Sequence, residues 1–156
     1  MDKRTKIIED MEASHEAMLA QLNEIDKNRK VYPLWTIREI LAHLSGWDDS
    51  VVSYLSALKN GEIPPVLAPR GVDVYNEETV STREGLSYDR IVSEYIQTRA
   101  RVIELVRSIP EEMVTQESTL PWGDPGSLQT IVDIFKDHEM EHVQDIEKLI
   151  RESKPA

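Results

Sequence analysis

The sequence predicts an all-α fold: a four-helix bundle with an additional short helix in the long connection between the second and third helices. Three observations predict it. Apolar residues recur at three- and four-residue steps through four long segments, which is the spacing of one helical face. Helix-capping residues precede three of these segments. No segment shows a convincing strand pattern. Because the chain has 156 residues, we expect a single domain over 1–156.

The first helix is expected over about residues 3–27. His15 fills a gap in its apolar stripe, either as an ordinary core histidine or as a ligand or outer partner of a metal site. The stripe consists of Ile8, Met11, Met18, Leu22 and Ile25.

The second helix is expected to begin after Thr36, because Thr36 and Glu39 have the spacing of a capping box. Asn60-Gly61 is a typical end signal. His43 lies at the edge of the apolar stripe, from where it can reach the interior of a bundle. The stripe consists of Ile37, Ile40, Leu41, Leu44, Trp47, Val51, Tyr54 and Leu58.

Residues 62–72 carry three of the eight prolines and predict an irregular connection. A short helix is expected from Asp73 to about Thr82. The third long helix is expected over about 88–108, capped by Ser87 and followed by Pro110.

One helical turn is expected within 110–116, followed by a turn-rich loop over 120–126. Trp122 in this loop either forms the wall or lid of a pocket or covers the core. Together with Trp47 and Tyr75 it is our expected pocket wall, although Trp47 fits core packing equally well.

The fourth helix is expected over about 128–151, capped by Ser127. Its apolar stripe is interrupted by Glu139 and His142, with His138 at the edge. Burying an unpaired carboxylate is costly, so Glu139 is predicted to have a partner or to reach a cavity. The apolar members are Leu128, Ile131, Val132, Phe135, Ile146, Leu149 and Ile150.

Composition restricts the function. The net charge of −11 predicts no nucleic-acid partner and no binding to an anionic membrane surface. The chain has no Cys, so a metal site must use His, Asp or Glu. No signal sequence or membrane-length apolar run is visible, and we expect a soluble cytoplasmic protein.

Two histidines four residues apart, His138 and His142, share one helical face and can bind one metal ion. His43 can supply a third ligand from the second helix. Three protein ligands leave a coordination position open, as in catalytic zinc sites. The alternative is that these are core-edge histidines satisfied by carboxylate or backbone groups. Glu139 is a candidate catalytic general base or an outer partner. Asp145 is either a further outer partner or part of the solvated helix surface.

The pentapeptide 138–142 also matches H-E-x-x-H, the zinc-protease pattern in which the Glu is a general base. Such proteases usually take a third ligand from further downstream. The residues after His142 offer only acidic side chains on or just past the same helix. No strand is predicted that could bind an extended peptide. A metalloprotease is therefore not favoured.

The segment from Trp35 to Trp47 (WTIREILAHLSGW) resembles a signature of the DinB-like superfamily. The Trp122-Gly123 loop followed by His138-x-x-x-His142 is similar to its C-terminal half. The resemblance covers nearly the whole chain. It implies a bacterial protein with a four-helix bundle fold that often forms a homodimer. It also implies a divalent metal held by His43, His138 and His142, commonly zinc or nickel and sometimes iron or manganese.

The leading hypothesis is a metal-dependent enzyme acting on a small molecule. It would be an S-transferase using a low-molecular-weight thiol such as mycothiol or bacillithiol, or a hydrolase in which Glu139 carries a proton. Two alternatives remain. One is a non-catalytic small-molecule-binding, stress or resistance protein, and the other is a bundle whose metal is structural or absent.

Overall fold

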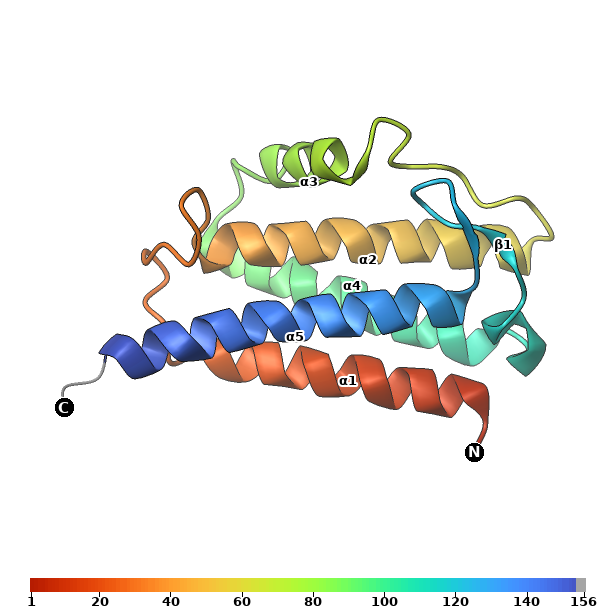
Figure 1. The fold of residues 1–156 in the computed structure, drawn as a ribbon, viewed down its shortest axis with the longest axis horizontal. Coiled ribbons are helices and arrows are strands. Elements are labelled where there is room, and N and C mark those ends of the chain that lie inside the picture. Colours follow the sequence, from red (N-terminus) through yellow and green to blue (C-terminus); the bar gives the residue numbers. More distant parts are fainter. Residues whose placement is uncertain (154–156) are drawn as a thin grey trace.

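The computed structural model describes residues 1–153. Four long helices form a bundle, which confirms the predicted fold (Figure 1). A fifth helix, α3, lies along the outer side of α2. The helices are α1 (Lys3–Gln21), α2 (Ile37–Lys59), α3 (Val72–Ser81), α4 (Tyr88–Ser108) and α5 (Leu128–Ser153), with a 3₁₀ turn, η1 (Glu111–Val114), before α5.

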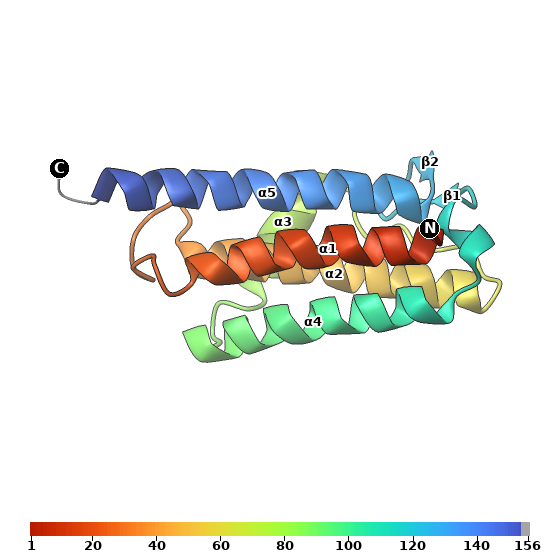
Figure 2. The same ribbon diagram turned by 90° about the horizontal axis from the view of Figure 1, so that it is seen from below.

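The long connection between α2 and α4 sets the topology. In Figure 1, α2 and α4 both run from left to right, whereas α1 and α5 run from right to left. Segment 60–87, which contains α3, returns the chain along the bundle so that α4 starts at the same end as α2. The principal pairings are α2 with α4 and α1 with α5 (Figure 2). Helices α2 and α5 are also in contact with each other, so each can contribute side chains to a shared site.

The helix boundaries follow local capping. Thr36 donates its backbone N–H to Glu39 Oε1 at 3.3 Å and its hydroxyl to Oε2 at 3.0 Å. These bonds form the predicted capping box at the start of α2. Helix α1 ends at Gln21, earlier than the expected position near 27. The Gln21 carbonyl accepts from Ile25 N at 3.0 Å, and Ile25 still packs against the core. The helical spacing of buried apolar residues thus continues past the end of α1, because the turn after the helix also buries Ile25. This is why the sequence predicted a longer helix.

Two very short strands, β1 (Ser118–Thr119) and β2 (Pro125–Gly126), form an antiparallel hairpin that the sequence did not predict. Two residues are too few for an alternating pattern to be recognised. The hairpin is tied to the connection after α2, because Leu67 N and Ala68 N both donate to Pro121 O, at 2.9 and 3.0 Å. These bonds place Trp122 over the side of the bundle formed by α2 and α5.

The bundle core consists of two apolar clusters, one toward each end. Between them, each long helix contributes a polar residue to one network of buried hydrogen bonds. We call these four residues the polar layer: Ser14, Asp48, Arg99 and Glu139. Within residues 1–153, no helix combines the length and apolar character required to span a membrane.

Candidate metal centre

Three histidines converge between α2 and α5. We call His43, His138 and His142 the histidine cluster. One ring nitrogen of each lies within 4.8 Å of the others. The ring centroids are 4.4 Å apart for His138 and His142, which are one helical turn apart, and 5.1 and 5.5 Å from His43 to these two. The structure thus brings together the three residues expected as ligands.

The ring nitrogens of this cluster fit a divalent cation. Both nitrogens of His43 and Nε2 of His142 are buried and have no hydrogen-bond partner among the described residues. Buried polar atoms are rarely left without a hydrogen-bond or metal partner, so these nitrogens are expected to bind one. Imidazole nitrogens at this separation suit zinc, nickel or iron.

The protonation state also favours metal binding. Burial, together with the neighbouring His138, lowers the pKa of His43 to about 3 and that of His142 to about 4. Burial also lowers the pKa of His138. All three rings are therefore neutral near pH 7, and the neutral imidazole is the form that binds a metal.

Tyr32 orients His142. Its hydroxyl lies 2.7 Å from His142 Nδ1 and donates to Asp145 Oδ2 at 2.6 Å. Since the single hydroxyl proton goes to Asp145, the Tyr32 oxygen accepts from Nδ1–H of His142. That tautomer leaves the Nε2 lone pair of His142 free to bind a metal.

Asp145 was expected beside the ligands, and it reaches His142 only through Tyr32. Tyr32 itself was missed, because it lies in the non-helical segment before α2, where no periodicity marks an inward side chain. Its backbone pairs with Trp35, and the Trp35 ring in turn lies 5.1 Å from the ring of His43. The short segment between α1 and α2 therefore contributes to the surroundings of two of the three histidines.

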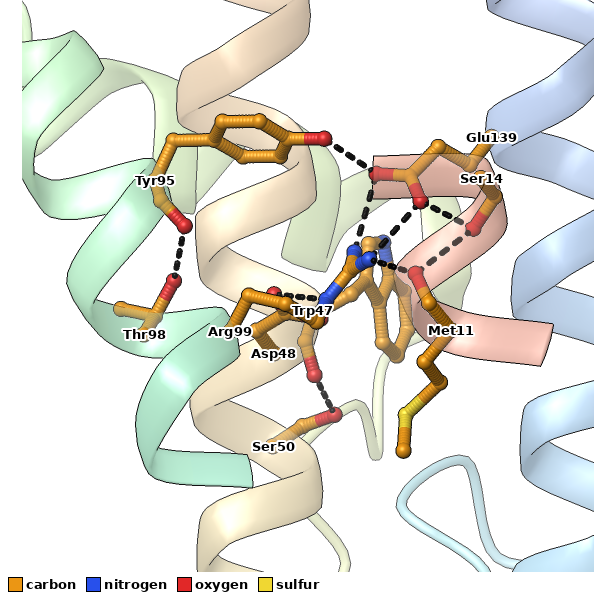
Figure 3. A network of polar contacts seen from close by, with 9 residues as sticks. All are labelled: Met11, Ser14, Trp47, Asp48, Ser50, Tyr95, Thr98, Arg99 and Glu139. Carbon is orange, nitrogen blue, oxygen red and sulfur yellow. Dashed lines mark hydrogen bonds and ion pairs between the residues drawn. The ribbon is translucent and has the colours of Figure 1, made fainter. Parts of the chain in front are cut away.

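Glu139 lies in the polar layer, where its carboxylate is fully engaged (Figure 3). Arg99 donates Nη1–H to Oε1 and Nη2–H to Oε2, both at 2.9 Å. Ser14 donates to Oε1 at 2.5 Å and Tyr95 to Oε2 at 2.6 Å. The prediction that Glu139 needs a partner is confirmed. Although burial opposes it, the charge and hydrogen bonds of Arg99 hold the pKa of Glu139 below its usual value.

Arg99 uses all five of its N–H groups in this layer. Besides the two bonds to Glu139, it donates Nε–H to Asp48 Oδ2 at 3.0 Å and Nη1–H to the carbonyl of Met11 at 3.1 Å. A longer contact of 3.5 Å joins Nη2 to Asp48 Oδ1. Burial raises the pKa of Asp48 to about 6 despite the neighbouring Arg99.

The role of Glu139 as a catalytic general base stays a prediction, and these contacts favour a positioning role. A carboxylate that accepts four hydrogen bonds is poorly placed to take a substrate proton. The sequence held a signal for its partner. Arg99 follows Tyr95 by four residues and precedes Val102 by three, so it lies on the core stripe of α4.

His15 lies apart from the histidine cluster. Its ring packs against Tyr95 with centroids 4.7 Å apart, and burial lowers its pKa to about 4. His15 was expected to be either a core histidine or a ligand or outer partner of a metal site, and this position fits a core histidine.

Two cavities formed by the described residues border the histidine cluster. The first, which we call the aromatic cavity, measures about 210 Å³ and is bordered by His138. The second, the wide cavity, measures about 820 Å³ and is bordered by His142 with the polar residues Asp73, Asn76 and Glu77. The aromatic cavity is lined by Leu44, Trp47, Asp48, Val72, Arg99, Trp122, Ile134, Phe135 and His138.

The expected pocket walls are partly as predicted. Trp47 and Trp122 line the aromatic cavity. Tyr75 instead supports Trp47, with ring centroids 4.4 Å apart, and its hydroxyl donates to the Gly46 carbonyl at 2.6 Å. The Trp47 indole donates to Asn76 of α3 at 2.5 Å. Helix α3 therefore supports Trp47 from outside and contributes Val72 to the lining of the cavity.

These features define a helical-bundle protein with a three-histidine centre between two facing helices. The family model of the DinB superfamily matches residues 7–146. The chain belongs to the DinB superfamily, as its sequence motifs indicated. No protein of curated function matches the sequence significantly.

Solved structures share the fold at low sequence identity. A mycothiol-dependent maleylpyruvate isomerase superposes with a TM-score of 0.74 at 14% identity, covering 92% of this chain and 60% of the isomerase. The chain thus spans about 60% of that protein's length. YfiT from Bacillus subtilis superposes with a TM-score of 0.70 at 16% identity, covering 97% of this chain and 88% of YfiT. It is described as a probable metal-dependent hydrolase with an unusual four-helix bundle topology.

The expectation of no nucleic-acid partner, drawn from net charge, is contradicted. The colibactin self-resistance protein ClbS, which has been crystallised with double-stranded DNA, shares the fold with a TM-score of 0.77 at 11% identity, covering 100% of this chain and 99% of ClbS. The expectation fails because net charge sums over the whole chain, whereas DNA binding depends on where basic side chains cluster.

Proposed function

We propose that this protein is a metal-dependent enzyme acting on a small molecule, with a divalent ion held by His43, His138 and His142. The observation that carries the proposal is the set of three neutral imidazoles within 4.8 Å, with buried nitrogens unpaired among the described residues. Zinc and nickel are the metals that the family resemblance favours, with iron and manganese as further candidates, and imidazole ligands suit zinc, nickel and iron.

The surrounding residues prepare this site. Tyr32 fixes the tautomer of His142, and the ring of Trp35 packs against the ring of the buried His43. A bound divalent metal supplies Lewis acidity and brings the pKa of a coordinated water or thiol toward neutrality. The aromatic and wide cavities give small molecules access beside His138 and His142 respectively.

Thiol transfer and hydrolysis both fit this arrangement. Transfer is supported by the two separate cavities, since a reaction between a thiol and a second substrate needs two binding places. The isomerase of the same fold is described as mycothiol-dependent, whereas YfiT is described as a probable hydrolase. A low-molecular-weight thiol is therefore the proposed co-substrate, with water as the alternative.

A second candidate is a non-catalytic resistance protein that binds a small molecule. ClbS, which matches this chain over nearly its full length, is described as a self-resistance protein. Turnover separates the two candidates. Incubation of a panel of electrophiles with and without bacillithiol, mycothiol or glutathione should yield thiol-dependent products. Binding of panel members without any product, with or without thiol, would favour the resistance protein.

Metal analysis tests the centre itself. The purified protein should contain about one divalent ion per chain, and His43→Ala and His142→Ala should each lose most of it. His15→Ala is the matched control, because His15 lies outside the cluster and should keep full occupancy. Full occupancy in both cluster variants would refute the three-histidine centre.

A further inference from the structure

The aromatic cavity has an unusual wall. Three of its lining rings meet at angles: Trp47 and Phe135 have centroids 5.7 Å apart with planes at 67°, and Trp122 lies 6.2 Å from each of them. Inclined rings at such distances present both faces and edges to a guest, an arrangement that favours another aromatic ring. The volume of about 210 Å³ lies below the roughly 300–1,000 Å³ of sites for drug-sized ligands. The cavity therefore suits one ring.

Few polar groups are available to that guest. Arg99 borders the cavity, yet all five of its N–H groups are engaged by Asp48, Glu139 and the Met11 carbonyl. Asp48 Oδ1 has only the 3.5 Å contact with Arg99. Asp48 Oδ1 can therefore accept one hydrogen bond, and the other polar border is His138, on the side of the histidine cluster. A guest can therefore make apolar contacts along the wall and direct a metal-binding group toward His138.

The buried charged side chains next to the cavity determine which ligand charge it can accept. Arg99 carries one positive charge and faces two carboxylates, Asp48 and Glu139, so the polar layer beneath the cavity has a net negative charge when both are ionised. In such a desolvated place an anionic substituent on the ring would be repelled and would lose its hydration.

We propose that the aromatic cavity is the substrate-specificity subsite. It accepts an uncharged aromatic ring whose oxygen or sulfur donor atom lies toward His138. The substrate class is thus a small aromatic compound with one metal-binding group and no anionic ring substituent. This inference deepens the proposed function and rests on it for the position of the donor atom, while the ring subsite rests only on the cavity.

Two hydroxamates test the subsite on zinc-loaded protein. Acetohydroxamate and benzohydroxamate carry the same metal-binding group, and only the second has a ring. Calorimetry should show benzohydroxamate binding about 10- to 100-fold more tightly, the gain expected from burying one ring. 4-Carboxybenzohydroxamate should lose that gain. Equal affinities for the first two compounds, or tight binding of the carboxylated one, would overturn the proposal.

Variants locate the ring. Phe135→Ala and Trp122→Ala should reduce the affinity ratio of the two hydroxamates to below about threefold. Ile63→Ala is the matched control, since Ile63 is 83% exposed and lines neither the aromatic cavity nor the wide cavity. It should leave the ratio unchanged. Equal loss of the ratio in all three variants would also contradict the subsite.

A metal-free experiment separates the two proposals. Benzyl alcohol added to metal-free protein should shift the indole NMR signals of Trp47 and Trp122, and Phe135→Ala should abolish the shifts. Shifts without any metal binding would uphold the subsite and refute the metal centre. Metal binding without shifts and without a ring preference would refute the subsite alone.

Discussion

The hydroxyl of Tyr32 lies 2.7 Å from Nδ1 of His142. Because the same hydroxyl donates to Asp145, a carboxylate on α5 is linked through a phenol to a histidine one turn earlier on that helix. Negative charge at the outer end of this chain increases the basicity of the imidazole. Tyr32 comes from the segment before α2, so the fold of that segment is coupled to the geometry of the histidine cluster.

Tyr32→Phe should weaken metal binding about 10- to 100-fold, since outer partners of ligating histidines typically contribute that much. Competition with a chelator of known affinity measures the change. Tyr54→Phe is the control, because the buried Tyr54 hydroxyl has no hydrogen-bond partner within residues 1–153. Unchanged affinity in Tyr32→Phe would show that the hydroxyl does not set the tautomer.

Glu139→Gln should destabilise the metal-free protein by about 2–4 kcal/mol. The amide keeps the shape but leaves the buried Arg99 charge with Asp48 as its only charged partner. Urea denaturation measures the free energy of unfolding. Glu141→Gln, an exposed neighbour on the same helix, should change it by less than about 0.5 kcal/mol. Full stability with lost turnover would instead support Glu139 as a general base.

Gly46→Ala should displace α3. A Cβ at Gly46 would lie 2.5 Å from Thr79 Cβ, so the added methyl group forces the two helices apart, at a cost of about 1–3 kcal/mol. None of the residues Val72–Ser81, all of which the structure describes, is buried, so α3 should detach before the bundle unfolds.

Hydrogen exchange measures this effect, with faster exchange expected in α3 and no change in α4. Gly85→Ala is the control, because no described atom beyond its chain neighbours lies within 4 Å of its added Cβ. Equal protection of α3 in Gly46→Ala and in the unaltered protein would argue against close packing at Thr79.

His15→Phe should make the protein more resistant to acid. The folded-state pKa of His15, about 4, lies below the ordinary value of 6.5. The unfolded state therefore binds more protons between these values, and stability falls as pH drops through this window.

Phenylalanine cannot titrate and retains the ring contact with Tyr95. The variant should gain about 1 kcal/mol over the unaltered protein between pH 7 and 4, a value reduced because His15 is only partly buried. Denaturation at several pH values checks this. Parallel stability curves for the two proteins would contradict the expectation.

The fold was predictable because each long helix carries its own burial pattern. The stripe from Ile37 to Leu58 identifies α2 without knowledge of its neighbours, and Thr36 marks its start. The histidine cluster was predictable for a related reason. His138 and His142 share a helical face, and His43 can turn inward on a second helix.

The polar layer and Tyr32 were not predictable in the same way. Arg99 pairs with Glu139 because α4 and α5 bring these two positions together at one level of the bundle, and periodicity along one helix does not report that register. Tyr32 lies outside any helix, so no period describes its direction. Residue types along one element predict burial, whereas partners depend on how elements pack.

The placement of the tryptophans has a spectroscopic consequence. The chain has three, and all of them lie at the site: Trp35 against His43, and Trp47 and Trp122 in the aromatic cavity. Intrinsic tryptophan emission therefore comes entirely from the surroundings of the histidine cluster. Metal loading and ring binding should each change that emission without any attached dye, so the native protein can serve as its own optical sensor in a ligand screen.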